Sequence, residues 1–145
     1  MLRITRDLLD AVVAHARRDH PDEACGVIAG PAGSGSPERL VPMLNAARSP
    51  TFYEFSSAEL LALYRDMDAR DEEPVVVYHS HTATEAAPSR TDVDLASEPG
   101  AHYLLVSTRD PDAVEVRSFR IAEGVATEEP VEVVEPVGVS RAVGG

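Results

Sequence analysis

Residues 74–92 read PVVVYHSHTATEAAPSRTD, and this stretch decides the fold class of the chain. Its first part, 74–81, begins with β-branched residues and has the composition of a buried central strand. Its second part begins a short helix over 89–97, for which Ser89 after Pro88 is a suitable N-cap. A central strand followed by a helix indicates a domain in which helices cover a sheet.

The rest of the chain adds helices and strands around this centre. Apolar residues recur at helical spacing over 6–20, with Thr5 as the expected N-cap. They recur again over 52–70, where Ser56 and Glu59 form a capping-box pair. Further strands are expected at 24–30, 39–46, 102–108, 114–121 and 127–135. Together these elements predict an α/β (α+β) fold with a mixed central sheet flanked by helices.

Length and composition limit the kind of protein. The 145 residues suit one domain, expected over 1–135, followed by a flexible C-terminal tail, 136–145. A net charge of −12 argues against a nucleic-acid partner, because phosphate contacts need clustered Lys and Arg. No apolar run approaches the ~18 residues of a membrane span, and the N-terminus lacks a signal-peptide pattern. The single cysteine, Cys25, rules out an internal disulfide and fits the cytoplasm.

His79 and His81 lie two positions apart at the end of the predicted central strand, so their side chains project from the same face. A rise of about 3.3 Å per residue separates them by roughly 7 Å along the backbone, which lets two imidazoles converge on one ion. The alternative is a pair of histidines on a solvated strand face. The apolar run 74–78 just before them looks buried and argues against that alternative.

Ser89 and Asp92 have the spacing of a capping pair, and helix capping alone would explain them. The same helix start can also aim a carboxylate at the end of the strand. With His79 and His81, Asp92 would supply three protein ligands and leave a fourth position open, as in catalytic zinc sites. These ligand types also suit non-haem iron(II), and ligand type alone leaves that alternative open.

Water activated at such a metal needs a general base, which the local sequence does not identify. Glu85 is close in sequence but belongs to the loop, while Glu23 precedes a buried strand and could reach the site only through the fold. Cys25 sits in an apolar strand, and we interpret it as a small buried residue rather than a nucleophile. Three other histidines lack ligand partners at a useful spacing and are interpreted as structural: His15, His20 and His102.

Two motifs together resemble those of a known family. The pattern His-x-His at 79–81, followed after seven residues by Ser-x-x-Asp at 89–92, resembles the signature of the JAMM (MPN+) zinc metallopeptidases. Residues 21–30, PDEACGVIAG, resemble the other motif of that family, a glutamate ahead of Cys-Gly and an apolar strand. The order of elements over 1–135 also fits, and the resemblance implies a cytidine-deaminase-like JAB1/MPN domain.

By position, the resemblance also implies the parts of a hydrolytic site. His79, His81 and Asp92 would bind Zn²⁺. Glu23 would act as general acid and base on the attacking water, and Ser89 would help to hold the polarised carbonyl and the tetrahedral intermediate. The resemblance therefore implies zinc-assisted hydrolysis of an amide bond.

One departure narrows the resemblance to a subgroup. Many family members have proline where this chain has Thr82, while all five signature residues are present. Together with 15–27, 49–55 and 102–111, this loop resembles an actinobacterial subgroup that acts on a ubiquitin-like sulfur-carrier protein charged with cysteine. That carrier ends in Gly-Gly. The resemblance implies a hydrolase that cuts the carrier's C-terminal amide bond and releases free cysteine for cysteine biosynthesis.

Other functions fit parts of the sequence. A JAMM peptidase or isopeptidase could act on other ubiquitin-like or short peptide substrates, although the short loops lack room for a large ubiquitin-binding insertion. A non-catalytic scaffold of the same fold would be expected to have lost ligands. Arg90 could hold the carboxylate of the leaving cysteine, and a solvated first-turn arginine explains it at least as well. The oligomeric state is not predicted.

Overall fold

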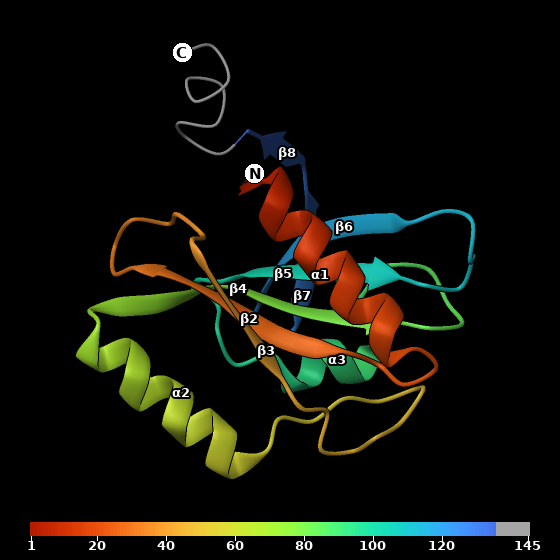
Figure 1. The fold of residues 1–145 in the computed structure, drawn as a ribbon, viewed down its shortest axis with the longest axis horizontal. Coiled ribbons are helices and arrows are strands. Elements are labelled where there is room, and N and C mark those ends of the chain that lie inside the picture. Colours follow the sequence, from red (N-terminus) through yellow and green to blue (C-terminus); the bar gives the residue numbers. More distant parts are fainter. Residues whose placement is uncertain (136–145) are drawn as a thin grey trace.

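The largest part of the fold is a six-stranded sheet, seen in a computed structural model that describes residues 1–135 (Figure 1). Its strands are β2 (Cys25–Pro31), β3 (Arg39–Met43), β4 (Glu72–His81), β5 (His102–Ser107), β6 (Glu115–Ala122) and β7 (Val125–Glu129). Their order across the sheet is β3-β2-β4-β5-β6-β7. The central pair β4 and β5 is parallel and the other neighbours are antiparallel, which confirms the predicted mixed sheet.

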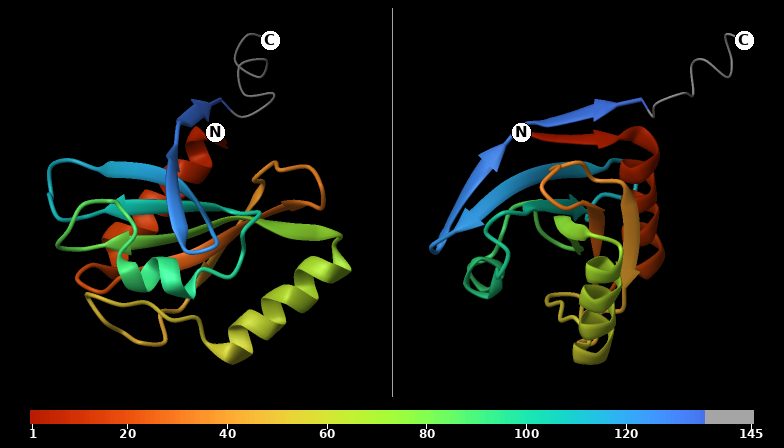
Figure 2. Two further views of the ribbon diagram at one scale, coloured as in Figure 1. Left: turned by 180° about the vertical axis from the view of Figure 1, so that it is seen from behind. Right: turned by 90° about the vertical axis from the view of Figure 1, so that its left-hand side faces the viewer.

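Helices cover both faces of this sheet. They are α1 (Arg6–Asp19), α2 (Ser57–Ala69) and α3 (Arg90–Leu95). Figures 1 and 2 show α1 across one face, with α2 and α3 on the other side. The buried clusters agree, because Val12 of α1 packs with Val76 of β4, whereas Leu63 of α2 packs with Val27 of β2. The predicted α/β class with flanking helices is confirmed.

β4 sends alternate side chains to the two faces. Val76 and Tyr78 belong to the apolar cluster that contains residues of α1. Val77 belongs to the cluster on the opposite face, against which α3 packs. Because side chains alternate along a strand, His79 and His81 share the face of Val77. The carboxyl end of β4 therefore presents both histidines on the side of α3, the helix that follows it.

The prediction of one final strand over 127–135 is wrong. β7 ends at Glu129, and a new strand, β8 (Val131–Val134), begins after Pro130. Proline has no N–H to donate to a ladder, so the chain leaves the larger sheet there. β8 instead pairs in parallel with β1 (Leu2–Thr5), an N-terminal strand that the sequence analysis did not predict (Figure 2).

The two longer helices differ from expectation at their N-termini. The predicted cap Thr5 makes no side-chain hydrogen bond to α1. Ser56 accepts a 3.4 Å hydrogen bond from the Glu59 N–H, but the Glu59 carboxylate accepts from the Leu44 N–H at 2.9 Å instead of closing the box. The helix itself begins directly after Ser56, as the expected cap within the stretch 52–70 requires.

Two further expectations concern the chain end and membranes. Residues 136–145, the predicted tail, lie outside the described residues, so the domain boundary at residue 135 stays a prediction. Among the helices of the described range, none combines the length and the apolar character that a membrane span requires.

Candidate metal centre

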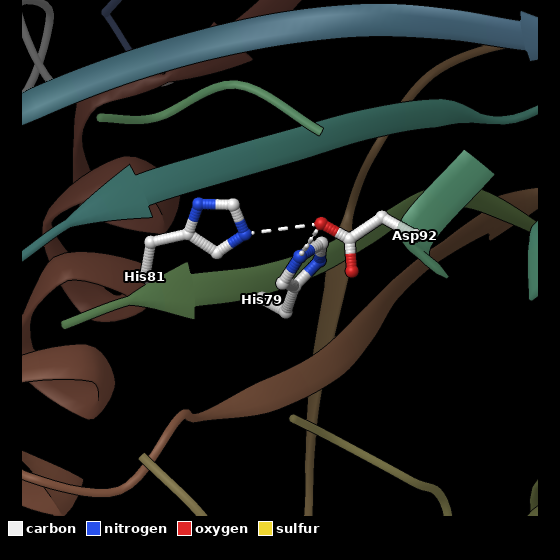
Figure 3. Close-up of side chains that lie close together, drawn as sticks. All are labelled: His79, His81 and Asp92. Atoms are coloured by element: carbon white, nitrogen blue, oxygen red, sulfur yellow. Dashed lines mark hydrogen bonds and ion pairs between the residues drawn. The ribbon is translucent and has the colours of Figure 1, made fainter. Parts of the chain in front are cut away.

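Three of the predicted site residues meet at the carboxyl end of β4 (Figure 3). His79 Nε2 lies 3.1 Å from Asp92 Oδ2, and His81 Nε2 lies 3.0 Å from the same oxygen. Both histidines are buried, with exposed fractions of 2% and 6%. His79, His81 and Asp92 each offer one ligand atom, and these three atoms lie within 4.8 Å of one another, so the group could hold a metal ion.

The capping box at the start of α3 aims Asp92 at the histidines. Ser89 Oγ accepts a 3.1 Å hydrogen bond from the Asp92 N–H, and Asp92 Oδ2 accepts a 2.9 Å hydrogen bond from the Ser89 N–H. The predicted capping pair is therefore confirmed. The carboxylate oxygen that closes the box is also the oxygen that faces both histidines. Helix capping and the placement of the carboxylate are thus one arrangement.

The two histidine rings are held in different ways. His81 Nδ1 lies 2.8 Å from the backbone carbonyl of Glu85, which can only accept, so Nδ1 donates and Nε2 is the nitrogen that faces the site. Both ring nitrogens of His79 are buried and have no hydrogen-bond partner among the described residues. Such orphaned buried nitrogens are rare in folded proteins, and coordination to a metal ion explains Nε2, the nitrogen that faces Asp92.

The spacing of the ligand atoms fits a tetrahedral metal. Bonds of about 2.0–2.1 Å from zinc to nitrogen or oxygen place tetrahedral ligand atoms about 3.3 Å apart. The two contacts from the histidines to Asp92, at 3.0 and 3.1 Å, are close to that separation. Three protein ligands leave a fourth position for water or substrate, as in catalytic sites. The donor set and its geometry therefore fit zinc.

Burial and charge set the protonation states of these groups. Burial lowers the pKa of His79, against the attraction of Asp92. Burial also opposes ionisation of Asp92, but its contacts with the two histidines outweigh burial and hold the pKa of Asp92 below its usual range. For His81, burial is again outweighed, by Asp92 and the Glu85 carbonyl, and the pKa is raised. Metal binding requires an ionised carboxylate and neutral imidazoles, so it would displace the proton of His81.

Glu23 lies beside this group through the pairing of β2 with β4. The two strands are antiparallel, with Cys25 opposite His79. Glu23 lies two residues before Cys25 and His81 lies two residues after His79, so the antiparallel direction brings Glu23 near His81 and Asp92, whose charges act on it. Glu23 is 5% exposed. Burial raises the pKa of Glu23 to about 7, and the charge of Asp92 adds to that rise while His81 opposes it. A carboxyl group that titrates near neutrality suits proton transfer.

A buried asparagine, which the sequence analysis missed, holds the segment that carries Glu23. Asn45 Nδ2 donates to the Glu23 carbonyl at 3.0 Å and to the Phe52 carbonyl at 2.9 Å. Asn45 Oδ1 accepts from the Glu54 N–H at 3.1 Å. Asn45 thereby ties the loop between β3 and α2 to the start of β2. Nothing in its local sequence marks it, because its role depends on contacts made across the fold.

Two other residues considered from the sequence lie at the edge of the site. Arg90 occupies the first position of α3, with a 90% exposed side chain that pairs at 3.3 Å with Asp94 one turn later. Its binding of substrate stays a prediction. Glu85 is exposed, and its backbone carbonyl rather than its carboxylate contacts His81. Glu23 is therefore the better placed of the two carboxylates considered as the base.

The remaining candidates are structural, as predicted. Cys25 is fully buried, and burial raises its pKa to about 12, which makes a nucleophilic thiolate unfavourable. The other histidines contact partners elsewhere in the fold: His15 contacts Tyr78, His20 contacts Thr108 and His102 contacts Glu129.

Comparison with known proteins finds one matching family model and several relatives that are named as peptidases or proteases. Residues 5–122 match the Prok-JAB model, which describes prokaryotic homologs of the JAB domain. The chain is 67% identical over 135 residues to the CysO-cysteine peptidase of Mycobacterium tuberculosis, covering 93% of this chain and 92% of the relative. It is 33% identical over 111 residues to desampylase of Haloferax volcanii, covering 73% and 80%. It is also 30% identical over 125 residues to a probable TtuB-protein conjugate cleaving protease of Thermus thermophilus, covering 86% and 78%.

Solved structures match along almost the whole chain. A solution structure of a protein from Desulfitobacterium hafniense has 31% identity and a TM-score of 0.82, covering 95% of this chain and 96% of that one. A JAB1/MPN domain protein from Archaeoglobus fulgidus shares the fold at 22% identity and a TM-score of 0.59, covering 92% and 99%. The predicted JAB1/MPN fold is thereby confirmed. The chain belongs to the prokaryotic JAB-domain family, the JAMM family that its two motifs indicated.

Proposed function

We propose that this protein is a zinc-dependent hydrolase that cleaves the C-terminal amide bond of a cysteine-charged, ubiquitin-like sulfur-carrier protein and releases free cysteine. The observation that carries the proposal is the convergence of His79, His81 and Asp92 beside a buried Glu23 whose pKa is raised to about 7. A catalytic base works best with a pKa near the working pH. The 67% identity to a CysO-cysteine peptidase supports the choice of substrate.

In this proposal, His79 Nε2, His81 Nε2 and Asp92 Oδ2 hold the metal. A zinc ion bound there would acidify water and polarise the scissile carbonyl. The Glu85 carbonyl keeps His81 in the tautomer that leaves Nε2 free to bind. The capping box of α3 holds the carboxylate of Asp92 in place, so little reorganisation is needed when the metal binds.

Glu23 and Ser89 supply the proton transfer and the hydrogen bond to the developing oxyanion. The Glu23 carboxylate takes a proton from the attacking water and passes it to the leaving amine of cysteine. Ser89 Oγ already accepts from the Asp92 N–H, so its own hydrogen is available to donate to the oxyanion. Ser89 is exposed and, with Asp92, lines a cleft of about 220 Å³ through which a substrate could approach.

The proposed partner is a carrier whose tail ends in Gly-Gly. Residues without side chains can approach a narrow metal site closely. Arg90 beside the cleft would pair with the carboxylate of the leaving cysteine, since guanidinium and carboxylate form charge-assisted hydrogen bonds. The net charge of −12 suits neither nucleic acid nor an anionic surface as partner. We place the reaction in cytoplasmic cysteine biosynthesis, where a lone buried thiol such as Cys25 remains reduced.

A second substrate class is favoured by one of the relatives. The Thermus thermophilus relative is named as a probable protease of TtuB-protein conjugates, which suggests that the same site could cleave isopeptide bonds or short peptides. A non-catalytic scaffold is less well supported, because all five signature residues are present.

The test is incubation of the purified protein with a cysteine-charged carrier, followed by mass spectrometry of the carrier. We expect the carrier to lose the mass of one cysteine residue. Chelation should stop the reaction, and added zinc should restore it, since the ligands remain in place. A ubiquitin-like isopeptide conjugate and a short peptide serve as competing substrates.

Two results would contradict the proposal in different ways. Faster cleavage of the isopeptide conjugate or the peptide than of the charged carrier would support the second substrate class. Cysteine release that persists undiminished after the metal is removed and its absence verified would contradict the metal-dependent mechanism.

A further inference from the structure

His79 lacks the support that metal-binding histidines normally have. Such histidines usually donate their second ring N–H to a carbonyl, a carboxylate or water, which fixes the ring orientation. His81 follows this rule through the Glu85 carbonyl. Both nitrogens of His79 are without a hydrogen-bond partner in the described part of the chain, although the ring is only 2% exposed. Among the protein groups of the described residues, packing is what orients this ring.

The packing comes chiefly from one aromatic ring. The ring of Tyr53 stacks on the imidazole of His79, with centroids 4.3 Å apart and planes at 24°. His81 meets the same imidazole in an edge-on contact at 5.1 Å and 60°. A stacked ring of this size restricts rotation about the bond that joins the imidazole to its backbone. From this geometry we infer that Tyr53 is a positioning residue, which holds the His79 imidazole so that Nε2 faces Asp92.

Tyr53 is itself held from two sides. Phe55 packs against its ring edge-to-face, with centroids 5.6 Å apart and planes at 71°. Asn45 hydrogen-bonds the backbone of both chain neighbours of Tyr53, accepting from the Glu54 N–H and donating to the Phe52 carbonyl. The loop that carries Tyr53 is thus anchored by the same side chain that anchors the Glu23 carbonyl. The ring is a fixed support for the imidazole.

This role is separate from substrate contact, although Tyr53 could have both. Tyr53 lines the 220 Å³ cleft beside Ser89 and also a larger apolar cavity of about 390 Å³. A loss of activity alone would therefore not distinguish a weakened metal site from a weakened substrate site. Zinc affinity measured without substrate does distinguish them. The inference rests on the proposed function only in assuming that the site binds zinc.

The experiment compares zinc affinity, measured by competition with a chelator, and the visible spectrum of the Co²⁺-substituted protein. Tyr53→Phe keeps the ring and should match the wild type in both. Tyr53→Leu and Tyr53→Met remove the ring, and each should weaken zinc binding by roughly 10-fold, the lower end of the range for residues that support a ligand. Each should also shift the Co²⁺ absorption bands. Phe52→Leu is the matched control, because Phe52 lines the same two cavities.

The outcomes separate this inference from the proposed function. If the wild type takes up no zinc, both the proposed function and this inference are contradicted. If the wild type binds zinc and a folded Tyr53→Leu or Tyr53→Met variant keeps its affinity and spectrum, this inference alone is overturned. It is also overturned if Phe52→Leu weakens zinc binding as much as Tyr53→Leu does, because the effect would then belong to the loop and not to the ring. Two ring-free variants are used so that failure of one to fold leaves the other to decide.

Discussion

Two buried histidines, His15 of α1 and His79 of β4, lie on opposite faces of the sheet at β4 and differ in their partners. On the α1 face, His15 Nδ1 lies 2.7 Å from the Tyr78 hydroxyl, and His15 Nε2 lies 3.1 Å from Asp19 Oδ2. A neutral ring with its proton on Nε2 satisfies both contacts. On the other face, His79 Nε2 lies 3.1 Å from the carboxylate oxygen that His81 also faces, and neither ring nitrogen is hydrogen-bonded within the described residues.

The difference shows that burial alone does not identify a ligand. His15 is 4% exposed and His79 is 2% exposed, so the two rings are buried to nearly the same extent. What distinguishes them is that His15 Nδ1 is hydrogen-bonded to the Tyr78 hydroxyl, while His79 Nε2 converges with ligand atoms of His81 and Asp92. A structural histidine should therefore contribute to stability, and a ligand histidine should contribute to metal binding. The following predictions test that separation, beginning with the largest effect.

Replacing each histidine by alanine should affect a different property, zinc binding for His79 and folding stability for His15. His79→Ala removes one of three ligands, so we expect zinc binding and cysteine release to fall to background. His15→Ala leaves the Tyr78 hydroxyl buried without a partner, which should lower the free energy of unfolding by about 1–3 kcal/mol. Zinc content per chain and urea unfolding curves measure the two effects. Equal loss of zinc in both variants would remove the distinction between the faces.

Replacing the base should stop catalysis without emptying the site. Glu23→Gln keeps the shape of the side chain but cannot take a proton, so kcat/KM should fall roughly 10²–10⁴-fold. Its zinc affinity should stay near that of the wild type, because Glu23 is not among the converging ligand atoms. Glu54→Gln, at an exposed carboxylate in the loop before α2, is the control. Undiminished turnover by Glu23→Gln would show that another group moves the proton.

Two serine caps allow the capping role to be separated from the catalytic role. Ser89→Ala and Ser56→Ala each remove a side chain that accepts from a helical N–H, so each should lower stability by about 1 kcal/mol. Only Ser89 lies beside the metal site, and loss of its donated hydrogen bond should lower kcat roughly 10²–10³-fold. Thermal unfolding and steady-state kinetics measure the two effects. If both variants lose the same small fraction of activity, Ser89 acts only as a cap.

The smallest expected effect is on the stability of the metal-free protein. The pKa of Glu23 is raised from its ordinary range to about 7, so the folded state favours the protonated form. Folding stability should therefore be lost as pH rises from about 4.5 to about 7, because ionisation is easier in the unfolded chain. Glu23→Gln cannot ionise, and should raise the Tm at pH 8 by roughly 5 °C while leaving it unchanged at pH 4. A Tm difference that is the same at both pH values would contradict this account.

The sequence predicted those parts of the site that depend on the spacing of residues within a single strand or helix. The two histidines could be paired because strand residues two apart share a face, and Asp92 could be aimed because a capping box fixes the first helical turn. Such spacing rules survive folding, so these elements could be predicted before any contact was known.

Other features depend on contacts between distant segments and could not be predicted. Glu23 was placed by resemblance, while its physical position follows from the register of β2 against β4. The roles of Asn45 and Tyr53 arise where one loop meets the start of β2 and the end of β4. The strand Leu2–Thr5 is too short to show a period, and its pairing with β8 is decided by the far end of the chain. Pro130 was a visible signal that the last predicted strand had to be divided.

The central claim is that the convergent face of β4 is a metal site, and anomalous diffraction at the zinc absorption edge tests it most directly. Crystals of the protein purified with zinc should show one strong peak per chain, about 2.0–2.1 Å from His79 Nε2 and His81 Nε2 and about 2.0–2.2 Å from an oxygen of Asp92. The peak should be absent from crystals of His79→Ala and present in those of His15→Ala. A zinc peak elsewhere on the chain, with none between these three side chains, would contradict the account.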